Sequence, residues 1–338
     1  MSNRDFSHGD NEGNKGLNSR QDACGTHDRL SASFSLFALC KRPSYDLGMK
    51  TARYWHLRKD GLIECDLCPR HCHVAEGKRG ACFIRRRIGD ELIAESYGRA
   101  CGLAVDPIEK KPLYHFLPGS SVLSFGTVGC NLTCGFCQNF HLSRAASFEG
   151  TPASPEEIAE ATISHTCASV AFTYNEPTVF FEYAVDTAKA CHARGLKTVA
   201  VTNGWIEPEP RKEFFEHIDA ANVDLKAFTE RFYTKLCGAT LQPVLDTLLY
   251  IKKETDIHLE VTTLLIPGQN DSPAEIDAMT KWAVVNLGPD VPWHFSAYRP
   301  TLEWNEAPPT PLETLLQAKE IAEANGLQYV HLGNVFSR

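Results

Sequence analysis

The fold class is decided by residues 121–140, which read SVLSFGTVGCNLTCGFCQNF. The segment opens with a strand-like run and continues into three cysteines, Cys130, Cys134 and Cys137, with Phe136 just before the last. Three thiolates on one short loop can bind three irons of a [4Fe–4S] cube, because such clusters take soft anionic ligands. The spacing C-x3-C-x2-C therefore predicts an iron–sulfur site at the end of a first strand.

The loop supplies only three ligands, so one iron of the cube would be left open to bind a small chelating ligand, as an open zinc site binds water. Gly126, Gly129 and Gly135 would let the loop turn tightly around an inorganic core. Two other interpretations remain. The three cysteines could be buried structural thiols, or they could bind zinc with His141 as the fourth ligand.

From Ser121 onward the chain alternates candidate strands and helices, which predicts a parallel α/β sheet. The predicted strands are 121–127, 169–174, 196–202, 220–226, 258–266, 293–298 and a short last one at 328–332. Three predicted helices start with a Ser or Thr cap, a proline and a glutamate, at Ser154, Ser272 and Thr310. Residues 119–338 are therefore expected to form a partial (βα)6 TIM-like barrel. An open Rossmann-type sheet is the alternative, but no G-x-G-x-x-G follows the first strand.

Residues 49–118 are expected to form a small Cys-rich module ahead of the barrel. It carries four cysteines in the spacing C-x2-C-x3-C-x9-C: Cys65, Cys68, Cys72 and Cys82. Four thiolates would complete a structural zinc site or hold an auxiliary iron–sulfur cluster, so a second metal is expected here. The alternatives are thiols used in substrate or redox exchange and buried, unligated thiols. The other cysteines are interpreted as core or surface thiols: Cys24, Cys40, Cys101, Cys167, Cys191 and Cys237.

Residues 1–48 are polar and aperiodic, which predicts a disordered leader. Patterned sequence begins at Met49, so we expect the leader to be dispensable and Met49 to be the authentic start. The one apolar stretch of the leader, residues 34–40, is too short for a membrane helix. The charged residues Lys41 and Arg42 follow this stretch, whereas a secretory signal has its charges before the apolar run.

Composition narrows the function classes. The chain has 338 residues, is 43% hydrophobic and carries a net charge of −8, which fits a globular protein and argues against a nucleic-acid partner. Its 13 cysteines are odd in number and partly clustered, which favours metal binding in a reducing compartment, so a cytoplasmic location is expected. No apolar run reaches the roughly 20 residues of a membrane helix, so no membrane partner is expected.

The three-cysteine loop resembles the signature of the radical S-adenosylmethionine (SAM) superfamily. The segments CPRHC, DPIEKKPLYHF, GCNLTCGFCQN, FTYNEPT and HLGNV extend this likeness over about residues 49–338. They resemble the radical SAM enzyme of the AmmeMemoRadiSam system, in the pyruvate formate-lyase-activating-enzyme-like group. The resemblance implies that SAM chelates the open iron and that an electron from the cluster cleaves it to methionine and a 5′-deoxyadenosyl radical, which abstracts hydrogen.

The group resemblance implies an activase of a glycyl radical enzyme. The alternatives are a radical modifier of another protein or small-molecule substrate and a non-catalytic metal-binding scaffold. The stretch between Cys137 and Ser169 has no added ferredoxin-type cysteine set, so an external electron donor of the ferredoxin or flavodoxin type is expected. No catalytic residue and no substrate can be named from the sequence.

Candidate SAM-binding residues follow from the rule that sites in parallel barrels lie at the carboxyl ends of strands. The second strand ends in Tyr174, Asn175 and Glu176, where the resembled family usually has Gly-Gly-Glu to receive the SAM ammonium group. Glu176 keeps the carboxylate that a cation requires, although both glycines are replaced. A helix-start residue that complements the helix dipole is the alternative for Glu176.

Three later strands add candidates. Thr202 and Asn203 match the polar group of the resembled family near the ribose or carboxylate of SAM, or else form a plain turn. Alternation places Asp224 and Lys226 on one face, either inward, near the SAM carboxylate, or outward as a structural pair. His294, on the sixth strand, matches a position near SAM or is a core histidine.

Overall fold

The computed structural model describes residues 49–145 and 150–335. The predicted leader, and with it the proposal about the start of the chain, lies outside the described residues.

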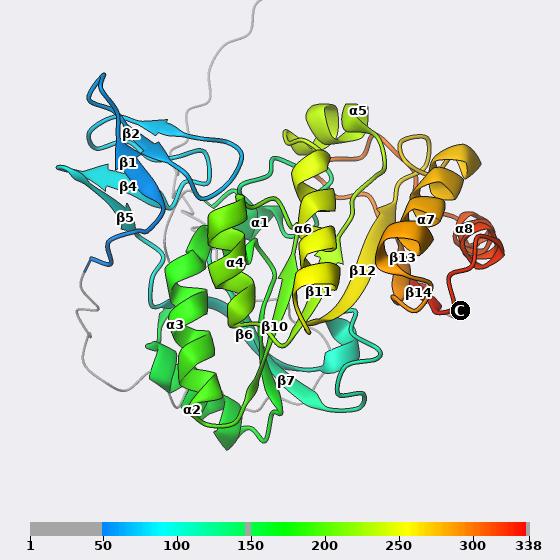
Figure 1. The fold of residues 1–338 in the computed structure, drawn as a ribbon, viewed down its shortest axis with the longest axis horizontal. Helices are drawn as coiled ribbons and strands as arrows, with labels where there is room; N and C mark the ends of the chain where they lie inside the picture. Colours follow the sequence, from blue (N-terminus) through cyan, green and yellow to red (C-terminus); the bar gives the residue numbers. More distant parts are fainter. Residues whose placement is uncertain (1–48, 146–149, 336–338) are drawn as a thin grey trace, which may run out of the picture.

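A nine-stranded sheet forms the centre of the molecule, in the order β14-β13-β12-β11-β10-β9-β7-β6-β8 (Figure 1). Its strands are β6 (Arg99–Pro107), β7 (Ser121–Gly126), β8 (Thr151–Pro152), β9 (Ser169–Phe172), β10 (Lys197–Thr202), β11 (Ala220–Asp224), β12 (His258–Leu265), β13 (Trp293–Ala297) and β14 (Val330–Gly333). The seven strands β7, β9, β10, β11, β12, β13 and β14 pair in parallel in this order, which is also their order along the chain. A doubly wound sheet reverses its strand order at a switch point, and this sheet does not. The structure therefore confirms the α/β class and a mostly parallel sheet, in which β6 pairs antiparallel with both β7 and β8.

Helices follow the strands and cover the sheet (Figure 1). The longer ones are α2 (Pro155–Ser164), α3 (Phe181–His192), α4 (Pro208–Glu216), α6 (Gln242–Glu254), α7 (Pro273–Leu287) and α8 (Leu312–Ala324). The short ones are η2 (Ile108–Lys110), α1 (Phe140–Ser143), η3 (Pro177–Phe180), α5 (Glu230–Phe232) and the π-helical η4 (Tyr233–Cys237). None of these described helices is long and apolar enough to span a bilayer.

Two of the three predicted helix caps form. The Ser154 side chain accepts the Glu157 amide while the Glu157 carboxylate accepts the Ser154 amide, a complete capping box. The Ser272 side chain accepts the Glu275 amide. Glu275 does not close a box, because its carboxylate accepts the Phe228 amide at 2.7 Å instead.

The cap predicted at Thr310 is wrong. Helix α8 begins at Leu312 with Pro311 in the cap position and no side-chain cap. The Thr310 hydroxyl accepts the Tyr298 amide at 2.8 Å and donates to the Leu265 carbonyl at 2.6 Å. It therefore joins two strand ends, a long-range use that the local sequence pattern does not reveal.

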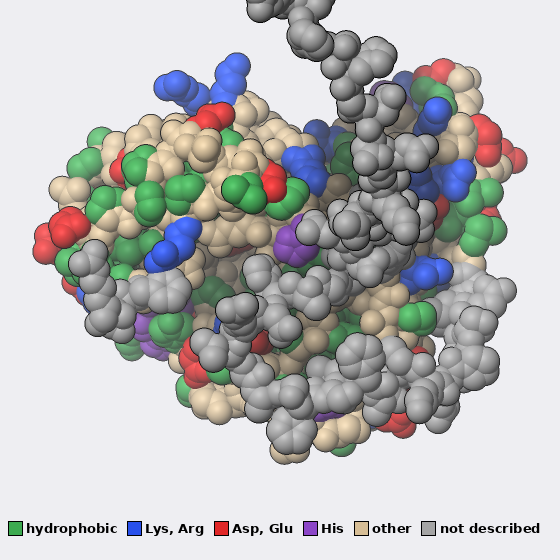
Figure 2. All heavy atoms as spheres, turned by 180° about the vertical axis from the view of Figure 1, so that it is seen from behind, with side chains coloured by type: hydrophobic (Ala, Val, Ile, Leu, Met, Phe, Trp, Pro, Cys, Tyr) green, Lys and Arg blue, Asp and Glu red, His purple; other side chains and the backbone are tan. Residues whose placement is uncertain are grey.

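The N-terminal part forms two small antiparallel sheets beside the central sheet (Figure 1). They contain β1 (Trp55–Leu57), β2 (Ile63–Cys65) and β3 (His73–Val74), and β4 (Arg85–Ile88) with β5 (Glu91–Ala94). The domain boundary predicted between residues 118 and 119 stays a prediction. Strand pairing crosses this boundary, because β6, which precedes it, runs antiparallel to β7, which follows it. On the face shown in Figure 2, the described acidic and basic side chains are interspersed.

Candidate cofactor site

A cavity of about 260 Å³ opens at the carboxyl ends of the parallel strands. Its lining includes Cys130, Cys134 and Cys137 from the loop after β7, Tyr174, Asn175 and Glu176 after β9, Asn203 after β10, Asp224 and Lys226 from β11 and just beyond, and Thr262, Leu264 and Ser296 from β12 and β13. The strand-end rule thus places most of the predicted site residues in one cavity.

The three thiols fit a cluster better than a single ion. Among the described residues, only His56, Glu64 and Asp66 bring three possible ligand atoms within 4.8 Å of one another. A tetrahedral zinc ion would draw its sulfur ligands to about 3.8 Å apart, given Zn–S bonds near 2.3 Å. An iron–sulfur cube lies between its ligands and holds them further apart. The three loop thiols do not all lie within 4.8 Å of one another, so their arrangement does not favour a single zinc ion.

Glycine is required where the cluster loop begins. Gly129 has φ +87°, and a Cβ atom on it would lie 2.3 Å from the Cys82 carbonyl oxygen. A Cβ atom on Gly126 would lie equally close, at 2.3 Å, to the Thr173 carbonyl oxygen. The chain can therefore pass between the Cys-rich segment and the end of β9 only without side chains at these positions.

The thiols of the loop lie in a setting that keeps them protonated without a metal. Burial raises the pKa of Cys130 and of Cys137. For Cys134 the first cause is a hydrogen bond with the Cys237 thiol, followed by burial, and its pKa is raised as well. Metal binding would have to displace these protons. Cys237, at the end of η4, is fully buried behind the loop, and the sequence interpretation had treated it as an unrelated thiol.

Glu176 is buried and strongly hydrogen-bonded. Its Oε1 accepts the Thr178 amide at 3.0 Å, the Thr178 hydroxyl at 2.8 Å and the Thr202 hydroxyl at 2.7 Å. Its Oε2 accepts one bond, from the Asn203 amide at 2.7 Å. Burial raises the pKa of Glu176, and these hydrogen bonds oppose the rise. Glu176 is thus a helix-start residue, since it caps η3, and it also lines the cavity with acceptor capacity left on Oε2.

Asn175 positions the cluster loop. Its Oδ1 accepts the Thr127 amide at 2.9 Å, and its Nδ2 donates to the Thr127 hydroxyl and to the carbonyls of Val128 and Gly129 at 2.9–3.2 Å. Its amide therefore has little capacity left for a ligand. The sequence predicted a direct contact with SAM, which stays a prediction, while the structure gives Asn175 a role in holding the backbone just before Cys130.

We expect Asn175→Ala to lower the free energy of unfolding by about 1–3 kcal/mol, because the Thr127 amide would lose its acceptor and one buried polar group left unsatisfied costs this much. The measurement is urea unfolding of the full chain, followed by iron content after reconstitution. Asn286→Ala is the matched control, because the Asn286 amide makes only a local bond to the Trp282 carbonyl on α7. Equal stability losses in the two variants would contradict the positioning role.

Thr202 and Asn203 reach the site in different ways. Thr202 does not line the cavity, and its hydroxyl supports Glu176. The Asn203 side chain lines the cavity and donates to Asn131 Oδ1 at 2.9 Å, next to Cys130. The pair therefore connects the ends of β9 and β10 to the cluster loop.

Asp224 and Lys226 both face the cavity and form an ion pair of 2.6 Å. This resolves the inward or outward choice that strand alternation had left open. Burial lowers the pKa of Lys226, but Asp224 outweighs it and the pKa is raised, so Lys226 remains charged. The lining of the cavity thus contains a cation as well as the Glu176 carboxylate.

His294 does not line this cavity. It is buried on β13, bonds Glu260 at 2.6 Å and stacks on His331. Burial opposes the charge of Glu260, but hydrogen bonds from His258 and His294 hold its pKa at about 2. The predicted SAM contact of His294 stays a prediction, and its described contacts are those of a core histidine.

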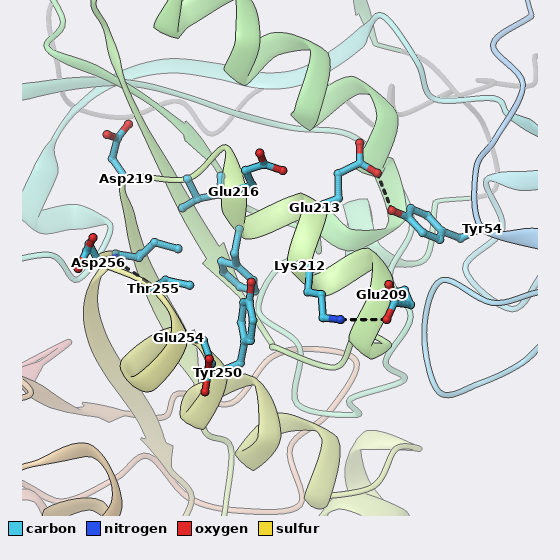
Figure 3. A pocket seen from close by; sticks show the side chains of 13 residues that line it. Tyr54, Glu209, Lys212, Glu213, Glu216, Asp219, Tyr250, Glu254, Thr255 and Asp256 are labelled. Atoms are coloured by element: carbon cyan, nitrogen blue, oxygen red, sulfur yellow. Dashed lines mark hydrogen bonds and ion pairs between the residues drawn. The ribbon is translucent and has the colours of Figure 1, made fainter.

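Other hollows in the described structure lie away from this cavity. The four cysteines of the N-terminal part line a small separate cavity. A hollow of about 790 Å³ lies beside α4 and α6 and has an acidic lining without thiols (Figure 3). In Figure 3, Glu213 points to Tyr54 and Lys212 to Glu209. Asp219 pairs with Lys197, so at least three of the acidic groups already have partners.

Comparisons with known proteins show which family this chain resembles. Residues 125–279 match the Radical SAM superfamily. An uncharacterized protein of Methanocaldococcus jannaschii is 42% identical over 289 residues, 85% of this chain and 86% of that protein. The benzylsuccinate synthase activating enzyme of Thauera aromatica is 25% identical over 195 residues, 54% of this chain and 57% of that enzyme. A radical SAM methyltransferase from Sphaerobacter thermophilus has a similar fold, with TM-score 0.52, 14% identity and coverage of 85% of this chain and 78% of that one.

Proposed function

This chain belongs to the radical SAM superfamily, and from that membership we propose that it cleaves SAM reductively in the cavity at the strand ends. One observation carries the proposal: three thiols, a buried carboxylate and an ion-paired lysine converge on a single cavity. SAM carries an ammonium group and a carboxylate, which complement these two charges.

Different residues of the cavity would bind the cluster and the charged groups of SAM. A [4Fe–4S] cluster on Cys130, Cys134 and Cys137 would supply the electron that splits SAM into methionine and a 5′-deoxyadenosyl radical. Glu176 Oε2 accepts the ammonium group of SAM in a charge-assisted hydrogen bond, and Lys226 attracts its carboxylate. Thr202 acts through Glu176, which it holds in place.

The test uses the full chain, reconstituted anaerobically, reduced and incubated with SAM. We expect methionine and 5′-deoxyadenosine in equal amounts and a cluster EPR signal that SAM perturbs. A reduced, cluster-loaded chain that leaves SAM intact would identify the protein as a metal-binding scaffold instead of an enzyme.

For the hydrogen donor we propose a glycyl radical enzyme, with this chain as its activase. The similarity to the benzylsuccinate synthase activating enzyme, 25% over 195 residues, supports this choice. A radical modifier of another protein or small molecule is the second candidate, favoured by the segments CPRHC and HLGNV that resemble the AmmeMemoRadiSam system. In both cases a separate ferredoxin- or flavodoxin-type protein would supply the electrons.

The two candidates predict different radicals. With the reduced chain, SAM and a glycyl radical enzyme encoded beside it, the activase predicts a stable glycyl radical signal by EPR, because the hydrogen atom is taken from the partner backbone. The control replaces the acceptor glycine of that partner by alanine. SAM cleavage without any radical on the partner would favour the modifier.

A further inference from the structure

One cavity is lined by all four cysteines of the N-terminal part, Cys65, Cys68, Cys72 and Cys82. They come from β2, from the loop between β2 and β3, and from the loop between β3 and β4. Cys65 ends β2, and Cys82 precedes β4. Three of the four side chains are buried, and Cys72 is half-buried. Their spacing in the sequence allowed several interpretations, but their convergence on one cavity gives them a common centre.

The four sulfur atoms are not arranged as ligands of one ion. Within residues 49–145 and 150–335, no three of these sulfurs lie within 4.8 Å of one another. A single tetrahedral ion would hold them about 3.8 Å apart, given Zn–S bonds near 2.3 Å. A four-iron cube separates its ligands further, and the three thiols of the first cavity likewise do not all lie within 4.8 Å of one another.

Each of the four sulfur atoms faces a backbone amide, which is a hydrogen-bond donor of the kind that tunes iron–sulfur clusters. The donors are the amides of Leu67 for Cys65, Arg70 for Cys68, Ala81 for Cys72 and Ile84 for Cys82. A set of donors arranged around four sulfurs is suited to anionic thiolates.

Arg85 is an independent sign of an anion in this cavity. Its guanidinium lines the cavity, is 1% exposed and lies close enough to Cys65 and Cys82 to interact with their charges. One edge pairs with Glu182, but Nε and Nη1 have no partner in the described part of the chain. Buried donors are nearly always satisfied in folded proteins. Four thiolates around a cluster would place anionic sulfur beside these two donors.

We propose that Cys65, Cys68, Cys72 and Cys82 bind a second [4Fe–4S] cluster, fully ligated by protein. The site lies directly against the loop of the first cluster. The Cys82 carbonyl packs on Gly129, and Arg70 donates to the Asn131 carbonyl at 2.7 and 3.1 Å. The second cluster therefore anchors the backbone on both sides of Cys130. The proposal does not depend on SAM cleavage by the first cluster.

The test counts iron and acid-labile sulfide in the full chain after anaerobic reconstitution. We expect about eight of each per chain, because each cube holds four irons and four sulfides. In the Cys130/Cys134/Cys137→Ala variant about four of each should remain, with an EPR signal after reduction that SAM does not change. A cluster with four protein ligands has no open iron for SAM, whereas the first cluster has one.

The complementary variant replaces Cys65, Cys68, Cys72 and Cys82 by alanine, and Cys191→Ala, a change of a buried thiol on α3, serves as the control. The control should keep about eight irons, and the complementary variant should keep no more than about four. Four irons in the unaltered chain, with a single EPR signal that SAM perturbs, would overturn the proposal even if every variant misfolds, because those irons would belong to the first cluster. One zinc ion, or a folded and metal-free Cys130/Cys134/Cys137→Ala variant, would overturn it as well.

Discussion

Replacing Cys130, Cys134 and Cys137 together by alanine is expected to abolish reductive SAM cleavage and the SAM-responsive EPR signal. The three thiols are the cluster ligands that the cavity offers, and each alanine removes one of them. Without the cluster there is no electron source beside SAM, so the loss should be complete. The measurement is methionine and 5′-deoxyadenosine formed by the reduced full-length variant.

Cys167→Ala is the control for this variant, because Cys167 is a buried thiol outside the cavity lining. It should retain both the signal and the activity. Circular dichroism of the triple variant checks that the sheet still forms. Reductive cleavage by the triple variant, above the rate without protein, would disprove the assignment of the ligands.

Replacing Glu176 by glutamine is expected to weaken SAM binding by about 1.5–3 kcal/mol, or roughly 10- to 150-fold in Kd. The change removes the charge that would meet the SAM ammonium group and leaves the size of the side chain unchanged. Iron content should stay the same, because Glu176 is not a ligand. The measurement is equilibrium binding of SAM to the cluster-loaded chain.

This test needs a variant that disturbs the helix cap and spares the charge. Thr178→Val removes the hydroxyl that donates to Glu176 Oε1 but keeps the carboxylate and its bond to the Asn203 amide. We expect it to lower stability and to leave SAM affinity nearly unchanged. If both variants lost SAM affinity equally, or if Glu176→Gln lost none, Glu176 would serve only as the cap of η3.

Most of the strands could be predicted because their pattern is local. Each predicted segment from 121 to 298 contains an observed strand one or two residues shorter, and the last, 328–332, overlaps β14 (Val330–Gly333), since apolar periodicity marks a buried strand wherever it occurs. The cap at Ser154 could be predicted because the residues that form it, Ser154 and Glu157, lie within four consecutive positions of the sequence. The cap at Thr310 failed because the tertiary fold uses that hydroxyl between β12 and β13.

The functions of individual polar side chains were harder to predict. A carboxylate at a strand end is visible in the sequence, but what it bonds is not. Asn175 and Thr127 are 48 residues apart, and His294 and Glu260 are 34 apart. Only the fold shows that the first pair supports the cluster loop and that the second lies in the core.

The sequence by itself determined the thiol set, the order of the strands and the edge of the sheet where the site lies. These follow from cysteine spacing, from side-chain periodicity and from the rule that parallel strands end at one edge. Only the tertiary structure decided that Asp224 and Lys226 face inward, that Cys237 contacts Cys134, and that Arg85 is buried beside four thiols. Such contacts depend on how distant segments pack, and a local pattern is compatible with many packings.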